Sequence, residues 1–512
     1  MARGAQQDAE TTVGAAIALC KELFTQYDEL WLIGHKGDHH VGLVDMGVLP
    51  NRQAVALTHV HSSLGLHTRQ ILKPPIGSSA SLGTIITGIN PGLKKHIEHV
   101  LSAGAKVCVL QPFPNEGFTS IVSELHAEQA FMATPPVALA QTYWEIEDKL
   151  RLAIYLEEYA QKAAFAELRP VIVPWSSTRE LGLDFEQYRK HFQLKDGQGI
   201  CLQEAVSAGG SGTTIVHSQA EIDALCRKSR WRRLADAGRI KITPEVIHAY
   251  PANGSACIVP LSQTDCMVLV DPLSHKPVGP GYSSLGNDWT KPWPASLQAQ
   301  YVRATVLLGR MLYQAFGYTG LFGPDFIVAA GDGELSLKLT EINPRWQGTT
   351  PYQTKNALFA RRIPLEVMHY IVKLDRTDGH IQKLIELIGD PDTYNTHSAA
   401  QHGVFYLKIM SRPGQQVLRD TNGHYRYANG KLQKVSARQG SLMENICTIK
   451  APKKGELLGK NLAPIGYVWG LSDRPVASMD PRNLTPYGTH LYNAAIQEIF
   501  GETLPGQIHP LQ

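Results

Sequence analysis

The sequence predicts a multidomain protein of mixed α/β and α+β class. Its 512 residues exceed what one hydrophobic core normally organises, so we expect two to four domains. The segment 97–113 has the pattern helix, glycine turn and buried strand, which is typical of a parallel α/β sheet. A long helical pattern at 296–316 precedes two strands joined by the turn GDG at 331–333, and after about residue 385 short strands and turns dominate. The chain should therefore begin with an α/β part, continue with a mixed part and end with a β-rich part.

The composition is that of an ordinary folded protein without a strong overall charge. An apolar content of 43% excludes a disordered chain, and a formal net charge of +3 gives no general attraction to nucleic acid or to anionic membranes. The seven cysteines form no CxxC pair, which favours reduced thiols over a disulfide framework. The apolar run at 14–20 is interrupted at once by Lys21 and Glu22 and is too short for a membrane span. We expect a cytoplasmic protein with no membrane and no nucleic-acid partner.

Apolar periodicity predicts the remaining elements. Residues 143–168 form the longest helical pattern, with Ile146, Leu150, Ala153 and Ile154 on one apolar face. The other predicted elements are a helix at 10–30, a strand at 30–34, a strand, glycine-rich loop, strand and helix within 199–225, strands within 255–271 and an irregular loop at 279–288.

Polar side chains alternate where the second strand of the GDG hairpin ends. In the stretch LKLTEINPRWQGTT, residues 337–350, Glu341, Asn343 and Arg345 share one parity, and the leucines at 337 and 339 precede them on what should be the same face. Counting back from the turn places Asp325 opposite Leu339–Glu341, and one residue of bulge decides the partner. Asp325, Glu341 and Asn343 should therefore converge on one point.

Three oxygen ligands, two of them anionic, suit a hard cation such as Mg²⁺, which completes its shell with waters and substrate phosphates. Arg345, one step further along, would lie beside that metal and hold an anionic oxygen. The alternative is a solvent-facing strand end with a salt bridge between Glu341 and Arg345. A strand that is buried as far as Leu339 should not then expose three polar residues without a ligand, which favours the metal site.

A metal that bridges phosphates requires a nucleotide, and SAGGSGTT at 207–214 is the best candidate for the phosphate contacts. Glycines let backbone N–H groups approach an anion, and Ser211, Thr213 and Thr214 add hydroxyls. A purely structural glycine-rich hairpin is the alternative. The sequence contains no GxxxxGK[ST], which excludes a P-loop, and no GxGxxG after a strand, so a Rossmann dinucleotide site is unsupported.

Three motifs together resemble the ATP-grasp superfamily, whose members clamp ATP between two α+β subdomains. They are DK at 148–149 opening a helix, the strand–GGSG–strand hairpin, and EINPR at 341–345, in that order and spacing. The resemblance covers about residues 130–360. It implies a pre-ATP-grasp α/β domain at 1–130, an ATP-grasp core at 131–384 with a lid subdomain at about 170–245, and a β-rich C-terminal domain at 385–512.

The resemblance also implies a role for each matching residue. One or two Mg²⁺ ions, with Mn²⁺ as a substitute, would be held beside the phosphates, and residues 207–214 would form a flexible lid over them. The implied residues are Lys149, Gln203, Gly209, Gly210, Ser211, Gly212, Thr213 and Glu245 for ATP, Asp325, Glu341 and Asn343 for the metal, and Arg345 for catalysis.

Two positions depart from the family pattern. Gln203, at the end of the strand ICLQE, stands where many members have a second ATP-binding lysine, and it brings no charge. The adenine-binding hinge should fall in RIKITPEVIHAY, residues 239–250, where Glu245 is the candidate contact and the segment that follows is long. These departures, together with the lack of an MKM-type biotin attachment sequence, make the chain look more like amide and peptide ligases of secondary metabolism than like biotin carboxylase.

The activity that the resemblance implies is that of an ADP-forming carboxylate–amine ligase. A small-molecule carboxylate would attack the γ-phosphate of ATP to give an acyl phosphate, and an amine would then displace phosphate; a homodimer is a further expectation. Two alternatives stay open. One is a carboxylate–thiol ligase or carboxylase with the same kind of intermediate, and the other is a nucleotide-binding regulatory protein without turnover.

Weaker hypotheses concern three other segments. GHKGDHH at 34–40 could offer histidines to a transition metal, although a polar loop is favoured. RKSRWRR at 227–233 could bind nucleic acid, although a solvated helix end is favoured. RWQGTT at 345–350 follows the metal strand, so Gln347, Thr349 and Thr350 could meet the acyl substrate.

Overall fold

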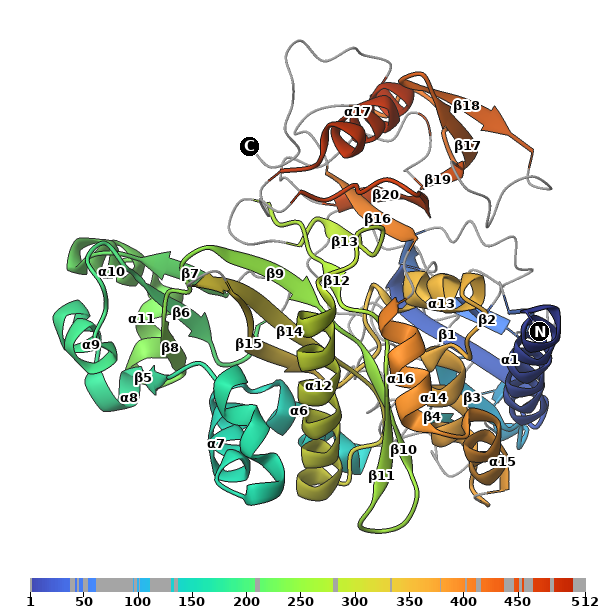
Figure 1. The fold of residues 1–512 in the computed structure, drawn as a ribbon, viewed down its shortest axis with the longest axis horizontal. Helices are drawn as coiled ribbons and strands as arrows, with labels where there is room; N and C mark the ends of the chain where they lie inside the picture. Colours follow the sequence, from blue (N-terminus) through green and yellow to red (C-terminus); the bar gives the residue numbers. More distant parts are fainter. Residues whose placement is uncertain are drawn as a thin grey trace.

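The computed structural model consists of three β-sheets with helices packed against them (Figure 1). The residues that it describes are 2–36, 42–43, 46–48, 54–60, 95, 99–100, 102–110, 130–132, 137–207, 212–279, 284–331, 334–377, 379–400, 403–410, 416–436, 446–450, 454, 464–478 and 483–500. No helix in these ranges is both long enough and apolar enough to cross a bilayer.

The N-terminal sheet has four strands, all parallel, which confirms the predicted α/β start. Its order is β2 (Ala54–Val60), β1 (Glu29–Lys36), β3 (Val107–Leu110) and β4 (Ala130–Met132). Helix α1 (Ala2–Phe24) begins and ends earlier than the predicted 10–30, and the chain is already in β1 by residue 29.

The second sheet has four antiparallel strands and is called the lid sheet. Its order is β5 (Ser176–Ser177), β8 (Ile240–Pro244), β6 (Ile200–Glu204) and β7 (Thr213–Val216). Its helices are α8 (Thr178–Leu181), α9 (Phe185–Phe192), α10 (Gln219–Cys226) and α11 (Ser229–Asp236). Ile200, Leu202, Ile240 and Ile242 pack into one apolar cluster with Tyr188 of α9. Because side chains alternate along a strand, Cys201, Gln203, Lys241 and Thr243 point from the other face of this sheet.

The third sheet has twelve strands and connects the middle of the chain to its C-terminal part. Its path is β11 (Cys266–Val270), β10 (Ala256–Pro260), β14 (Gly320–Gly331), β9 (Ala249–Asn253), β12 (Ser274–His275), β13 (Gly286–Asp288), β16 (Val404–Met410), β20 (Pro464–Leu471), β19 (Ile446–Lys450), β17 (Gly423–Ala428) and β18 (Lys431–Val435). β15 (Glu334–Asn343) pairs with β14 beside this path. The irregular loop predicted at 279–288 is therefore wrong for its last three residues, which form β13 between β12 and β16.

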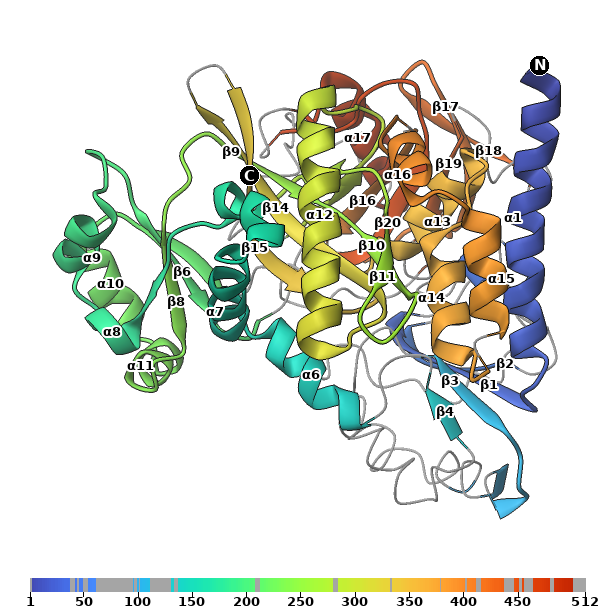
Figure 2. The ribbon, with the colours of Figure 1, turned by 60° about the horizontal axis from the view of Figure 1, so that its bottom comes forward.

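Helices cover the third sheet and extend toward the N-terminal sheet (Figure 2). α12 (Ala295–Phe316) matches the helix predicted at 296–316 and packs on β10, β11 and β15. The others are α13 (Thr350–Phe359), α14 (Leu365–Leu374), α15 (Gly379–Ile388), α16 (Pro391–Ala400) and α17 (Pro486–Phe500). α1 packs against α14 and α15, and both views place the lid sheet at the opposite end of the molecule. The domain division stays a prediction; α15 continues across its boundary at residue 384.

The single helix predicted at 143–168 is wrong. The chain forms α6 (Val137–Glu147), α7 (Lys149–Ala160) and a 3₁₀ segment, η3 (Ala163–Val171). Asp148 has extended backbone angles and its carboxylate accepts hydrogen bonds from the N–H groups of Leu150 and Arg151, so it caps a new helix. The break changes the phase of the buried face, which leaves Ile154 47% exposed.

A buried carboxyl between α13 and α14 should make stability depend on pH. Burial raises the pKa of Glu366 from 4.5 to about 8, although Thr354 donates to it at 2.6 Å and Lys355 lies near. A carboxyl whose pKa is higher in the folded protein stabilises the fold while protonated, and this stabilisation is lost as pH rises toward 8. Glu366→Gln should remove a slope of up to about 1.4 kcal/mol per pH unit from the free energy of unfolding. Denaturant titrations from pH 5 to 8 would show this, and exposed Glu386→Gln should keep the wild-type slope.

Candidate functional site

A bulge in β15 separates the apolar and polar parts of the hairpin. β14 pairs Phe326 with Leu339 and Asp325 with Glu341, so Thr340 is an extra residue on β15. The Thr340 hydroxyl donates to the carbonyl oxygen of Asp325 at 2.9 Å. The predicted convergence of the two arms at 325 and 341 is confirmed as a strand pairing.

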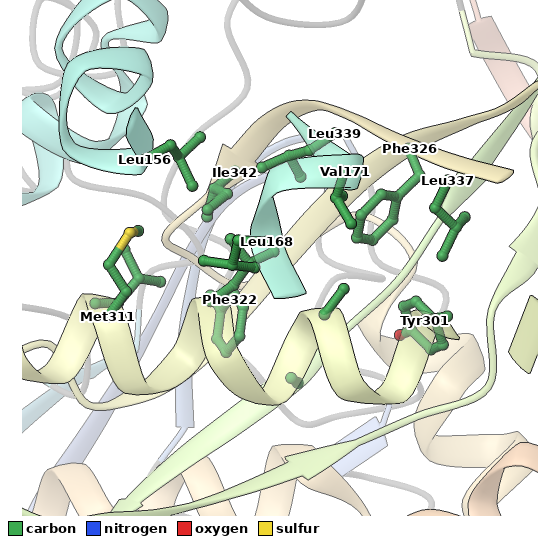
Figure 3. Close-up of a cluster of buried hydrophobic side chains, with 14 of the residues drawn as sticks. Leu156, Leu168, Val171, Tyr301, Met311, Phe322, Phe326, Leu337, Leu339 and Ile342 are labelled. Atoms are coloured by element: carbon green, nitrogen blue, oxygen red, sulfur yellow. The ribbon is translucent and has the colours of Figure 1, made fainter. Parts of the chain in front are cut away.

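The prediction that Leu337 and Leu339 share the face of Glu341 and Asn343 is wrong. Leu337, Leu339 and Ile342 lie with Phe326 in the apolar cluster that packs against α12 (Figure 3). Because the bulge shifts the alternation by one residue, Glu341 and Asn343 emerge on the other face of the strand pair. The leucines thus anchor the hairpin, and the polar residues face a cavity.

The cavity has a volume of about 820 Å³ and lies between the lid sheet and the third sheet. Strands β9, β14 and β15 form one wall, and β6, β7 and β8 form the other. Its polar lining includes Gln203, Ser207, Thr213, Lys241, Thr243, Glu245, Asn253, Lys276, Asp325, Glu341, Asn343, Arg345 and Gln347.

The two hairpin carboxylates, Asp325 and Glu341, are each paired with a lysine. Lys276, just after β12, donates to Asp325 at 2.7 Å, and Lys149, the first residue of α7, is 3.1 Å from Glu341. Burial opposes ionisation of Glu341, but the two lysines outweigh it and lower the pKa of Glu341 to about 2. Burial raises the pKa of Asp325, Lys276 opposes this, and the negative charge of Glu341 adds to it. Glu341 is therefore the more acidic member of the pair.

Lys149 also links the hairpin to the lid sheet. Its side chain is only 3% exposed, and its amine donates to the carbonyl oxygen of Ser207 at 3.2 Å as well as contacting Glu341. Its backbone N–H donates to Ala205 at 2.8 Å. The break at Asp148 is what places this lysine at a helix start instead of in the middle of a helix.

Arg345 is held beside the carboxylates by neighbours that sequence analysis did not assign to it. It donates to the Asn343 side-chain oxygen at 2.7 Å, and it lies 3.6 Å from Glu147 at the end of α6. The alternative salt bridge between Arg345 and Glu341 is not among the contacts of the described residues, where Lys149 pairs with Glu341 instead.

The remaining predicted nucleotide residues are distributed around the lid sheet. Gln203 and Thr213 pair across β6 and β7 and line the cavity. Gly212 lies against Ser207. Glu245 also lines the cavity, but its carboxylate accepts from the Gly199 N–H at 2.9 Å and contacts His217 at 3.0 Å. Gly209, Gly210 and Ser211 lie outside the described residues.

Among the polar cavity residues that sequence analysis missed, three lie around the hairpin carboxylates and Gln203. Asn253 on β9 donates to Asp325 at 2.6 Å and to Gln347 at 3.2 Å, Lys276 neutralises Asp325, and Lys241 on β8 lies opposite Gln203. Each lies on a strand, or just after one, whose neighbours in the sheet are not its neighbours in the sequence. Lys241 and Thr243 are two residues apart in the segment that contains the predicted hinge, so they share one face of a strand. This spacing is the sequence signal that could have identified Lys241.

Gln347 and Thr349 line the cavity, whereas Thr350 has a structural contact. Tyr406 and Lys408 of β16 line the same cavity, as do Ser284 and Asn287. The Thr350 hydroxyl accepts from the backbone N–H of Gln347, which fixes the turn into α13. The C-terminal strands thus contribute directly to the cavity.

The weaker hypotheses have separate outcomes. In RKSRWRR, Trp231 is buried in the lid-sheet core, and Arg230 pairs with Glu204, which supports the helix-end interpretation. His39 and His40 lie outside the described residues. Within the described ranges, no three His, Cys, Asp or Glu side chains form a metal-binding group. All seven cysteines are free.

The donor set at the hairpin fits a hard divalent cation. Asp325, Glu341 and Asn343 offer oxygen atoms, and the side-chain oxygen of Asn253 is buried without a hydrogen-bond partner beside Asp325. Oxygen ligands of this kind suit Mg²⁺. Two carboxylates and an amide do not fill the coordination shell of such a cation. Waters or oxygen atoms of a ligand would have to occupy the remaining positions.

Comparison with known proteins identifies the fold. No protein-family model and no curated protein matches the chain. Among solved structures, the biotin carboxylase domain of 2-oxoglutarate carboxylase from Hydrogenobacter thermophilus is 12% identical over 86% of each chain, with a TM-score of 0.53. Biotin carboxylase from Campylobacter jejuni is 11% identical over 87% of each chain, with a TM-score of 0.52. The chain has the ATP-grasp fold.

The ATP-grasp fold confirms the predicted class and accounts for a cavity clamped between two sheets. A third match, Rhizobium etli pyruvate carboxylase, is 11% identical over 88% of this chain and 36% of that chain, with a TM-score of 0.53. At identities of 11–12%, this structural similarity shows the fold alone. The chemistry of the chain has to be argued from its own residues.

The packing of Gln347 over β14 gives a test of the site's geometry. A Cβ on Gly323 would overlap the Gln347 amide, which accepts from Asn253 and from Thr349 at 3.1 Å. Gly323→Ala should displace this amide and lower the free energy of unfolding by about 1–3 kcal/mol. Gly348→Ala, which has open space around its Cβ, should be neutral.

Chemical denaturation of both variants checks this. In a Gln347→Ala background, Gly323→Ala should cost much less, because the overlapping group is gone. An equal cost in both backgrounds would contradict the proposed contact.

Proposed function

We propose that this protein is an ATP- and Mg²⁺-dependent ligase that activates a carboxylate as an acyl phosphate and joins it to an amine. The observation that carries the proposal is the carboxylate pair Asp325 and Glu341 in the wall of one cavity. Lys276 and Arg345 line the same cavity, and Lys149 pairs with Glu341. Such a site suits a metal-bound polyphosphate and a second, acidic substrate. The chain's ATP-grasp fold is consistent with this, and one structure that it resembles contains MgADP and bicarbonate.

Asp325, Glu341 and Asn343 would hold Mg²⁺, which neutralises charge on phosphate oxygens when bound. Lys149 sits where it can exchange its contact with Glu341 for a phosphate oxygen, and Arg345 can donate to the transferring group and to the acyl oxygen. Phosphoryl transfer depends mainly on alignment and charge neutralisation, which these fixed side chains supply.

The reaction would proceed in two displacements. A carboxylate oxygen of the substrate attacks the γ-phosphorus, the bond from that phosphorus to the β,γ-bridging oxygen breaks, and ADP leaves. The amine nitrogen then attacks the acyl carbon, the bond from that carbon to the phosphate oxygen breaks, and phosphate and a proton are released. Because acyl phosphates hydrolyse, the lid sheet has to exclude water between the two steps.

Activation of bicarbonate, as in a carboxylase, is the second candidate. The three similar solved structures named above are of carboxylases, and the same carboxylates and cations would suit a carboxyphosphate. A homodimer, a cytoplasmic location and a place in secondary metabolism stay predictions.

Trapping with hydroxylamine tests the proposal. The protein is incubated with ATP, Mg²⁺, hydroxylamine and a panel of amino acids and of mono- and dicarboxylic acids, and hydroxamate and ADP are measured. We expect hydroxamate with at least one organic acid and none with Asp325→Asn, which weakens the metal site. ADP release that requires only bicarbonate would identify the carboxylase instead, and no ADP release with any acid would overturn both candidates.

Loss of Arg345 should reduce turnover far more than substrate binding. Arg345→Ala removes a donor to the charge that develops on the transferring group, so kcat should fall by about 10²-fold or more. Exposed Arg303→Ala is the matched control and should be neutral. Steady-state ADP release measures both variants, with thermal unfolding as a check because Glu147 loses its partner. Near-normal turnover of Arg345→Ala would remove this role.

A further inference from the structure

Lys241 is a cavity-facing cation that the reaction described above does not use. It lies on β8 directly opposite Gln203 on β6, and both side chains line the cavity from the lid sheet. The apolar residues Ile240 and Ile242 on either side of it point into the lid-sheet core. The strand therefore holds Lys241 toward the cavity.

Lys241 differs from Lys149, Lys276 and Arg345 in having no carboxylate partner among the described residues. Lys149 pairs with Glu341, Lys276 with Asp325, and Arg345 with Glu147. The side chain of Lys241 makes no hydrogen bond and no ion pair within the described part of the chain, although the residue is only 6% exposed. A buried ammonium group without a counter-ion is costly, so a ligand that supplies negative charge would be favoured there.

The electrostatic surroundings agree with this geometry. Burial and, to a smaller extent, the positive charge of Lys149 together lower the pKa of Lys241 to about 8, while Cys201, Glu341 and Glu157 oppose the shift. The negative groups nearby therefore do not compensate its charge fully.

The position of Lys241 along β8 indicates which part of a ligand it meets. Thr243 and Glu245 follow it along the cavity wall in the predicted hinge, and the hairpin carboxylates lie across the cavity. A nucleotide with its base at the hinge and its terminal phosphate at the carboxylates would place its inner phosphates between them. The inner phosphates would therefore lie next to Lys241.

We propose that Lys241 binds the inner phosphates of the nucleotide and supplies, from β8, the positive charge that Gln203 cannot supply from β6. This inference rests on the proposed function, because it requires ATP in the cavity. Lys241 is thus a phosphate-binding residue for ATP and for ADP alike, whereas Arg345 acts on the group that is transferred.

A charge-swap experiment tests the assignment on the full chain. Calorimetry measures the affinity of ATP, ADP and adenosine for the wild type, Lys241→Gln, Lys241→Arg and the double variant Lys241→Gln with Gln203→Lys. Lys241→Gln should weaken ATP and ADP about 10- to 100-fold, the effect of one charge-assisted hydrogen bond, and should leave adenosine unchanged. Lys241→Arg should retain most of the affinity, and the double variant should recover part of it.

Exposed Lys190→Gln on α9 is the matched control and should bind all three ligands as the wild type does. Thermal unfolding confirms that each variant is folded. Unchanged ATP affinity in Lys241→Gln, or an equal loss for adenosine, would overturn the assignment while leaving the proposed function intact. Failure of the wild type to bind ATP would overturn the proposed function itself and this inference with it.

Discussion

Two negative charges, those of Asp325 and Glu341, lie side by side in the cavity, and the other contacts around them offset their repulsion. Asp325 and Glu341 pair across β14 and β15, so their repulsion and the loss of hydration both favour protonation. Lys276 and Lys149 counteract this, and both come from outside the hairpin. The cluster is balanced at two charges of each sign. A metal-bound polyphosphate would pair with both signs of this cluster, since it brings a cation to the carboxylates and anions to the lysines.

The bulge at Thr340 makes this arrangement compatible with a stable hairpin. Without the extra residue, Glu341 would continue the face of Leu337 and Leu339 and point into the apolar cluster that packs against α12. With it, one strand serves both the core and the cavity. The apolar residues hold the hairpin against α12. The carboxylates are therefore positioned by a rigid strand pair.

The sequence was sufficient where structure is determined locally. The hairpin, the lid strands around the glycine-rich loop and α12 follow from turn chemistry and apolar periodicity. The apolar pattern continues across Asp148, so periodicity alone missed the break there, whereas the DK motif at 148–149 placed a helix start at this capping residue. Asn253, Lys276 and Lys241 reach the cavity only through the order of strands in the sheets, which no local pattern contains. The alternation along β15 gave a wrong prediction for a related reason, because a pattern with a period of two residues does not reveal a bulge.

The way the sheets connect determines which parts of the cavity can move together. β13 pairs with β16, so Tyr406 and Lys408 belong to the same hydrogen-bonded sheet as β14 with Asp325. The lid sheet shares no strand pairing with it among the described residues and meets the start of α7 through Ala205 and Ser207. Any closure of the lid sheet would therefore carry Lys241 and Gln203 together toward the hairpin carboxylates and the β16 residues of the third sheet. Because Lys149 bonds to both parts, its amine lies at the joint, and a phosphate bound there would draw the two sheets together.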